Sequence, residues 1–297
     1  FNAGLRYDYY ALDAENDLIY NPDQEDYILA SDESYQVLTP KFSISYPTSD
    51  NSNLYARYSQ GFRPPVWYEL SSSFANLEFG YLTISNPDLK PEKSHDFEIG
   101  YKLFGDNYAT TFATYYSRYS EFMNAFSPAG VNKDGYDVFQ TQNVSDAETY
   151  GVEFSGMYFF SPKQEGFYIG NVFAWSEGND LSAGRPLETI IPLTNHLSLG
   201  YQEADDRWNV SAGMHYSGRP RLEADYPYYI PSTSLTFSLD AYWRINKSLR
   251  LNASINNLTN ETYFNFQDVR GRDRSREDIL RFSQPERNFQ IGAIFSF

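Results

Sequence analysis

The sequence lacks several features on which whole classes of protein depend. It has no cysteine, so neither disulfides nor thiolate metal sites are available. Only three histidines occur among 297 residues, and the chain contains no HExxH, no glycine-rich phosphate loop and no GxSxG. We therefore expect no catalytic site, no cofactor and no metal, and we predict that the protein is not an enzyme.

Long apolar runs and an excess of positive charge are also missing. No stretch approaches the length of a helix that crosses a membrane. The 23 Lys and Arg residues are outnumbered by 39 Asp and Glu residues, which gives a formal net charge of −16. Because affinity for nucleic acid comes from basic contacts to phosphate, this balance argues against a nucleic-acid partner.

Aromatic residues, in contrast, are abundant. They make up 18% of the chain, with 27 tyrosines and 23 phenylalanines. Tyrosine suits a surface that is apolar at one end and hydrated at the other, as in the aromatic girdles of membrane barrels. Composition alone leaves a tyrosine-rich soluble β-sandwich as the alternative.

An alternation of apolar and polar residues runs along most of the chain. Leu235, Phe237 and Leu239, for example, alternate with polar neighbours. The pattern predicts twelve strands of about ten residues, the length that crosses a bilayer when the strand is tilted. They cover approximately residues 2–10, 35–45, 52–60, 94–104, 108–118, 147–160, 166–175, 196–202, 208–216, 235–244, 249–256 and 289–297.

Short turns and long loops separate these strands in strict succession. The long loops cover residues 11–34, 61–92, 119–146, 176–194, 217–232 and 258–286. A sandwich has no reason to segregate loop lengths, whereas an up-and-down barrel has short periplasmic turns and long outer loops. We predict an all-β fold, an antiparallel up-and-down transmembrane β-barrel with an apolar face toward lipid and a polar face toward the lumen.

Three motifs carry a resemblance to a known family. The stretch 86–94 resembles the NPxLKPExS signature of TonB-dependent outer-membrane receptors, with matches at Asn86, Pro87, Leu89, Lys90, Pro91, Glu92 and Ser94. Upstream, residues 58–65 are similar to the family's GFRxP segment, and residues 255–263 are similar to its late NLxxxxY box. The last strand ends in Phe295 and Phe297, which resembles the signal that the barrel assembly machinery recognises.

This resemblance has consequences for the fold and the location. Receptors of the family have a 22-stranded barrel filled by an N-terminal plug that contacts TonB. The resemblance implies that residues 1–297 are one domain, the C-terminal half of such a barrel, in the outer membrane of a Gram-negative bacterium. Lipid and lipopolysaccharide would surround it, and the plug with its TonB contact would lie outside this chain. A complete twelve-stranded barrel is the alternative.

The resemblance also implies a function, namely import of a ligand captured by the outer loops. We expect a ferric siderophore, the commonest ligand class of the family. A haem receptor and a passive porin are the alternatives. Residues 61–89 resemble the FRAP…NPNL interval of haem receptors, but they lack the histidine that ligates haem there.

Such ligands are held by aromatic faces and by arginines that bind carboxylate or catecholate oxygen. The alternative roles of these side chains are loop packing and charge balance with nearby acids. The candidate ligand-binding residues are Arg63, Trp67, Tyr68, Tyr81, Arg219, Arg221, Tyr228, Arg272 and Arg274.

Overall fold

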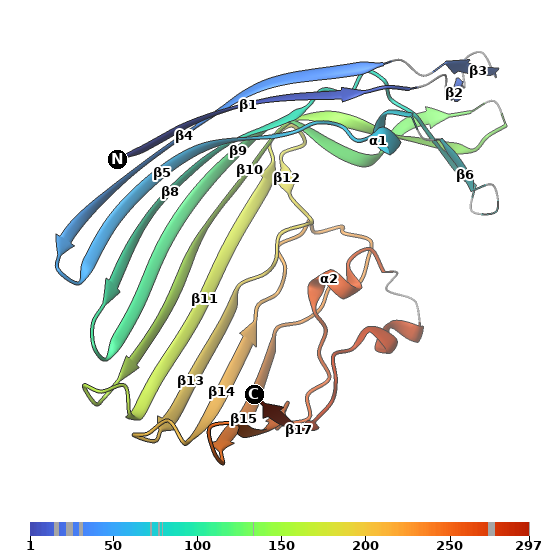
Figure 1. The fold of residues 1–297 in the computed structure, drawn as a ribbon. Coiled ribbons are helices and arrows are strands. Elements are labelled where there is room, and N and C mark those ends of the chain that lie inside the picture. The colour runs from blue at the N-terminus through green and yellow to red at the C-terminus, as the bar shows by residue number, and fades with distance from the viewer. Residues whose placement is uncertain are drawn as a thin grey trace.

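The computed structural model describes residues 1–14, 18–21, 26–29, 32–71, 73–76, 78, 80–132, 134–272 and 277–296. Within these residues the main element is a curved wall of twelve antiparallel strands that pair in chain order (Figure 1). The prediction of twelve antiparallel strands is confirmed. They are β1 (Asn2–Leu12), β4 (Glu33–Ser49), β5 (Ser52–Arg63), β8 (Glu92–Phe104), β9 (Tyr108–Val131), β10 (Asp137–Phe159), β11 (Gly166–Asp180), β13 (Thr194–Gln202), β14 (Trp208–Ser217), β15 (Ser234–Arg244), β16 (Leu249–Asn256) and β17 (Asn288–Phe295).

Smaller elements lie in the long loops. They are the strands β2 (Leu18–Asn21), β3 (Asp26–Leu29), β6 (Phe74–Asn76), β7 (Tyr81–Ile84) and β12 (Arg185–Pro186), the helices α1 (Trp67–Ser71) and α2 (Phe266–Val269), and the 3₁₀ helix η2 (Glu277–Phe282). Among the described residues, no helix has the length and apolar character needed to span a membrane.

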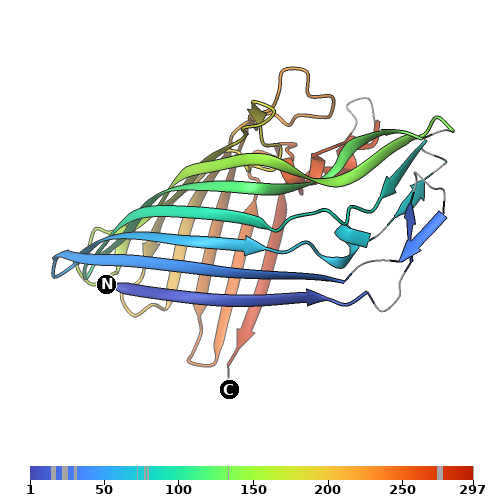
Figure 2. The ribbon, with the colours of Figure 1, turned by 90° about the horizontal axis from the view of Figure 1, so that it is seen from above.

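The wall has two ends and two edges. Short turns join the strands at one end, called here the turn end, and long loops join them at the other, called here the loop end (Figure 1). Seen from above, β1 and β17 lie at opposite edges of the curved sheet (Figure 2). In the described part of the chain, β1 pairs only with β4, and β17 pairs only with β16.

Cross-strand register sorts the side chains onto two faces. Leu199, Ala212, Leu239 and Ile255 are aligned across four neighbouring strands, so they share one face, and Leu199 and Leu239 are exposed there. Polar residues at the positions between them take the other face. An exposed apolar face of this kind fits a lipid environment, and the polar face fits the inside of a barrel.

Two aromatic groups mark the borders of the apolar face. At the turn end, Phe167 packs edge-on against Tyr201, whose ring stacks on Trp208. Toward the loop end, Tyr150 packs edge-on against Trp175. Phe167 and Trp175 lie on one strand, and at about 3.3 Å per residue and a tilt of about 40° they differ in height by roughly 20 Å. This is close to the apolar band of an outer-membrane barrel, about 25 Å.

The prediction of a long loop over residues 119–146 is wrong. β9 continues to Val131 and β10 begins at Asp137, so the two strands have 24 and 23 residues. Two register shifts in the β9–β10 pairing and a positive φ of 56° at Glu121 break the regular alternation there. Because the two-residue period is the sequence signal for a strand, these irregularities hide the extension. The hairpin is more than twice as long as a bilayer requires.

Candidate ligand-binding region

The family-motif residues tie a long loop to the β9–β10 hairpin. Asn86 donates a hydrogen bond from Nδ2 to the Thr141 carbonyl at 2.8 Å. Asn143 accepts from the Lys90 amide at 2.7 Å and donates to the Lys90 and Glu121 carbonyls at 2.9 and 2.6 Å. Pro87 and Pro91 keep the stretch between these ties from continuing as a helix or a central strand. The motif is therefore held by contacts to residues more than fifty positions further along.

A small apolar core lies beneath the motif. Leu89 is 3% exposed and packs with Leu70 of α1 and Met123 of β9. Leu12, at the end of β1, packs against the same cluster. Four separate segments of the loop end thus meet around one leucine of the motif.

Arg63, a predicted ligand contact, lies between two carboxylates. Its guanidinium donates to Glu92 at 2.7 and 3.1 Å and to Glu69 at 3.0 Å. Glu69 also accepts from the Val66 amide at 2.9 Å, and Glu92 accepts from the Met123 amide at 2.7 Å. This network closes the start of the β5–β8 loop over β9. Binding of ligand by Arg63 stays a prediction, and a ligand would have to compete with Glu69 and Glu92 for its donors.

The aromatic candidates of the same loop lie on two short elements. Trp67 and Tyr68 lie in α1, and Tyr68 is 66% exposed. Tyr81 begins β7, where its hydroxyl accepts from Asn76 at 3.2 Å and its ring packs edge-on against Phe139. β7 pairs in parallel with β10 and antiparallel with β6. We call β6, β7 and the loop-end halves of β9 and β10 (residues 121–131 and 137–144) the outer sheet.

The remaining arginine and tyrosine candidates lie in the loops that follow β14 and β16. Arg221 pairs with Glu177 of β11 at 2.7 Å. Arg272 lies over the Phe282 ring at 4.3 Å, and its carbonyl accepts from the Tyr229 amide at 2.7 Å. Tyr228 packs edge-on against Tyr226, which is 2% exposed. Burial raises the pKa of the Tyr226 phenol, and Glu188 adds to the rise. The two loops are packed against each other and against β11.

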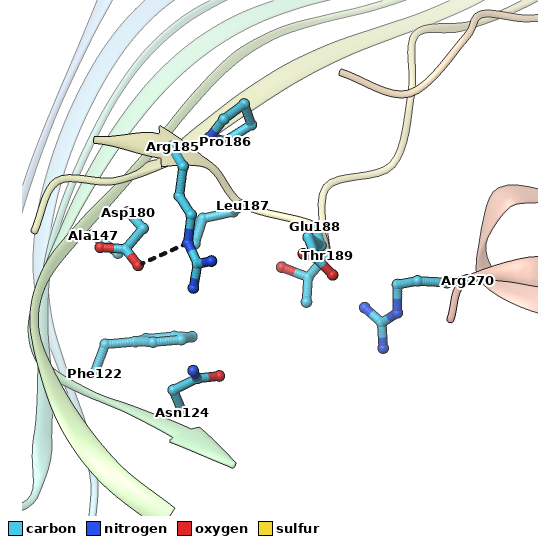
Figure 3. Close-up of a pocket in the computed structure, with 10 residues that line it drawn as sticks. All are labelled: Phe122, Asn124, Ala147, Asp180, Arg185, Pro186, Leu187, Glu188, Thr189 and Arg270. Atoms are coloured by element: carbon cyan, nitrogen blue, oxygen red, sulfur yellow. Dashed lines mark ion pairs between the residues drawn. The ribbon is translucent and has the colours of Figure 1, made fainter. Parts of the chain in front are cut away.

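A cavity of about 350 Å³ opens between the β9–β10 hairpin, the segment that joins β11 to β13, and Arg270 of the loop after β16 (Figure 3). Figure 3 shows Arg185 and Arg270 entering from different elements, with the Phe122 ring below Arg185. Arg185 is 3.6 Å from an Asp180 oxygen, a loose ion pair. The lining residues are Phe122, Asn124, Ala147, Asp180, Arg185, Pro186, Leu187, Glu188, Thr189 and Arg270.

This cavity has the chemistry of an anion-binding site with an aromatic ring on one side. Two guanidinium groups can bind carboxylate or catecholate oxygen, and a phenyl ring can contact a flat apolar group. Asp180 and Glu188 lie in the same lining and balance the charge of the two arginines. A ligand with two acidic groups would therefore compete with these carboxylates for the arginines.

The structure distributes the predicted residues over two regions. The first region holds Arg63, at the end of β5, with Trp67, Tyr68 and Tyr81 of the β5–β8 loop. The second holds Arg219, Arg221, Tyr228 and Arg272, in the loops after β14 and β16. Arg219 and Arg221 line a second cavity with Trp175 and Tyr216. Phe295 lies on β17 opposite Leu249, and Arg274 and Phe297 lie outside the described residues.

Sequence reasoning missed Arg185, Phe122 and Asn124 as cavity residues. Phe122 and Asn124 lie in the stretch expected to be a loop, and their position depends on the irregular β9–β10 pairing. Arg185 lies in the two-residue strand β12, which pairs back onto β11. The sequence signal for Arg185 is its position directly after a turn glycine, Gly184, whose φ is 65°.

The strand order, the two faces and the elaborated loop end define the wall of an outer-membrane barrel. Residues 1–258 match the family model described as "TonB dependent receptor-like, beta-barrel", and the chain belongs to this family. Members of the family are transport receptors of the outer membrane.

Curated relatives match most or nearly all of the chain. The hemoglobin-haptoglobin utilization protein B of Neisseria meningitidis serogroup A is 28% identical over 99% of this chain and 42% of its own length. A probable hemoglobin and hemoglobin-haptoglobin-binding protein 4 of Haemophilus influenzae is 25% identical over 81% of this chain and 27% of its own. The chain therefore spans less than half the length of these relatives.

Solved structures have the same fold. The copper transporter OprC superimposes with a TM-score of 0.78 at 20% identity, over 99% of this chain and 45% of that one. A mutant of the ferric enterobactin receptor PfeA of Pseudomonas aeruginosa gives a TM-score of 0.72 at 20% identity, over 88% and 40%.

Proposed function

We propose that the protein containing this chain is an outer-membrane receptor that takes up haem iron from a haemoglobin-type carrier protein. The observation that carries this proposal is the pair of curated relatives, which are named for haemoglobin and match 99% and 81% of the chain. They favour haem over the ferric siderophore expected from the sequence. Family membership favours a gated receptor over the passive-porin alternative.

The geometry of the loop end supports a protein partner. A stable protein–protein interface buries about 800 Å² on each side, which requires a platform larger than a pocket. The outer sheet extends the β9–β10 hairpin well beyond the bilayer, and it carries Phe74 at 60% and Val131 at 63% exposure. Exposed apolar side chains on such a platform fit the centre of a protein interface.

The cavity of Figure 3 supports the haem part of the proposal. Haem carries two propionate groups on a flat apolar ring. Arg185 and Arg270 would bind the propionates, and Phe122 would contact the ring. At about 350 Å³ the cavity would enclose only part of a porphyrin. The rest of the ligand would lie against other parts of the receptor.

The chain spans less than half the length of the two relatives, which supports assigning it one part of a larger receptor. We propose that residues 1–297 form the C-terminal part of a larger barrel and its outer loops. TonB would act on a plug domain elsewhere in the same polypeptide, and would draw energy from the inner membrane to open a path for the ligand. The barrel assembly machinery would insert the protein, and lipid with lipopolysaccharide would surround it.

Growth of receptor-deficient cells under iron limitation tests the proposal. Cells that carry the intact receptor should grow on haemoglobin as the sole iron source. Phe74→Asp combined with Val131→Asp should reduce haemoglobin binding to whole cells by about tenfold or more. This is the loss expected when two apolar side chains at the centre of an interface are replaced by charges. Leu280→Asp, an equally exposed leucine of η2, is the matched control. Growth on ferric chelates but not on haemoglobin would contradict the proposal.

A ferric siderophore is the second candidate, favoured by one observation. The described part of the segment between Gly61 and Leu89 contains arginine and tyrosine but no histidine, and the printed sequence has none there. In the same growth experiment, a siderophore receptor would be indifferent to the outer-sheet substitutions. It would instead lose uptake when Arg185 and Arg270 are both replaced by Gln.

A further inference from the structure

Two of the three histidines are direct neighbours on the polar face of the wall. His196 of β13 is aligned with His215 of β14, and their ring centres are 6.2 Å apart. Both side chains are exposed on that face. The third histidine, His95, differs, because its Nδ1 hydrogen-bonds to the Tyr58 hydroxyl at 2.8 Å and its ring stacks on Tyr58.

The surroundings of the pair leave its nitrogens available. Within the described residues, neither imidazole makes a hydrogen bond or an ion pair. Two of the neighbouring residues, Gly213 and Ser238, are small: a Cβ built on Gly213 would lie 3.2 Å from His196 Cε1 and 2.6 Å from Ser238 Oγ. Glycine at position 213 therefore lets the His196 ring lie against β14, the strand that carries His215.

We propose that His196 and His215 together bind a divalent transition-metal ion of the Cu²⁺ and Zn²⁺ class inside the barrel. Neutral imidazole is a good ligand for these ions, and Cu²⁺ is bound most tightly at a given nitrogen site. An imidazole nitrogen lies about 1.2 Å from its ring centre and binds a metal at about 2.0–2.1 Å, so two rings on one ion have centres up to roughly 6.5 Å apart. The observed 6.2 Å falls inside this limit.

The site is open rather than closed. No group of three or more His, Cys, Asp or Glu side chains suited to a metal occurs in the described part of the chain. Two histidines would fill two coordination positions, and water or a cargo ligand would fill the others. Such a site releases its ion readily, which fits a contact on a transport path better than a structural metal centre. The inference needs neither haem nor a carrier protein, so it is independent of the proposed function.

Cu²⁺ binding to the intact receptor, purified in detergent, tests the inference. Electron paramagnetic resonance distinguishes copper bound by two imidazole nitrogens from copper bound by one. The wild type should show a two-nitrogen signal that His196→Asn and His215→Asn each convert to a one-nitrogen signal. We expect each substitution to weaken binding on the order of tenfold or more, because a chelating pair is lost.

His95→Asn is the matched control, since it removes the remaining histidine of this chain and should leave the signal unchanged. Gly213→Ala should weaken copper binding without removing a ligand, because the added Cβ displaces the His196 ring. Folding of each variant is checked by the heat-dependent mobility of the barrel on a denaturing gel. An unchanged two-nitrogen signal in the His196→Asn/His215→Asn double variant would overturn the inference, as would an equal loss in His95→Asn.

Discussion

The wall and the loop end of this protein are held together by different kinds of interaction. In the wall, each strand pairs with the next wall strand along the chain. The two-residue alternation recurs from strand to strand, except where the β9–β10 pairing shifts register. At the loop end, single side chains connect segments that are far apart in sequence: Glu92 binds the Met123 amide, and Asn143 binds both backbone groups of Lys90.

Because of this difference, the wall and the loop end should respond differently to the loss of a single interaction. In the wall, many similar cross-strand pairs each contribute modestly to stability, so the loss of one pair has a small effect. The loop end depends on a few buried or half-buried groups, so the loss of one leaves a partner unsatisfied. We expect substitutions in the wall to change stability mainly when they alter contact with the bilayer. Substitutions at the loop end should instead change the local order of the loops.

The largest loss of stability is expected when a charged residue is placed on the apolar face of the wall. Leu239 lies near the middle of β15, four positions from Trp243 at the turn end. Leu239→Arg should destabilise the folded barrel by about 2–4 kcal/mol, since a guanidinium is costly at the bilayer midplane. Equilibrium unfolding of the intact receptor in lipid vesicles measures the change.

A second arginine substitution at nearly the same depth provides the comparison. Ser254 lies on the polar face opposite Asp240, which an arginine there could pair with. Ser254→Arg should therefore cost far less than Leu239→Arg. Equal costs would mean that the assignment of the two faces is wrong.

At the loop end, Glu92→Gln should release the β5–β8 loop while leaving the wall intact. The substitution removes the charge that binds Arg63 and weakens the acceptor for the Met123 amide. We expect local opening of residues 64–91 to become easier by about 1–3 kcal/mol, the range for hydrogen bonds to a charged group. Hydrogen exchange of the backbone amides in this segment reports the opening.

Glu121→Gln is the control for that experiment. Glu121 forms an exposed ion pair with Lys90 at 3.7 Å, and such pairs contribute less than about 1 kcal/mol. If both glutamine variants exchange equally fast in the segment, the Arg63 network does not hold the loop. If Glu92→Gln unfolds the whole barrel, the separation between wall and loop end is wrong.

The same contrast explains what the sequence could predict. Period-two alternation is a local signal, so the number, order and faces of the strands followed from it, and the boundaries were close for strands such as β8 and β15. The β9–β10 extension did not follow, because register shifts and the positive φ at Glu121 interrupt the period. The motif identified the family, but its physical role required knowing that Asn143 reaches back to Lys90.

The candidate site shows the limit more clearly. Arginine and aromatic residues in loops were a sound chemical signal, yet Arg63 is held by Glu69 and Glu92, and Arg221 is held by Glu177. Whether a loop arginine meets an internal carboxylate depends on how the loop folds back. The cavity arginine Arg185 depends in the same way on the pairing of β12 with β11.

Within the wall, a smaller effect is expected where tyrosine covers glycine across neighbouring strands. Tyr55 lies over Gly100, and a Cβ at Gly100 would lie 2.3 Å from its ring. Gly100→Ala should force the ring aside, weaken the hydrogen bond from Tyr55 to Glu98 and cost about 1 kcal/mol. Gly292→Ala, where nothing lies within 4 Å, should be close to neutral in the same unfolding titration.

The smallest effect belongs to the turn end and depends on pH. Asp206, in the turn between β13 and β14, accepts hydrogen bonds from Tyr242, Gln202 and Arg244. The Tyr242 hydroxyl, followed by Arg244, lowers the pKa of the Asp206 carboxyl. Asparagine suits this substitution because it tolerates the positive φ of 54° at this position.

A carboxyl whose pKa is lower in the folded than in the unfolded state stabilises the fold at pH values above its unfolded pKa, about 3.9 for aspartate. That contribution is lost as the pH falls through this value toward the folded pKa. Asp206→Asn should therefore lower stability modestly at pH 7, and the difference from wild type should shrink below about pH 4. Because the Asp206 side chain is half exposed, solvent screens the effect. A difference that stays constant from pH 7 to pH 3 would show that Asp206 acts through the shape of the turn rather than through its charge.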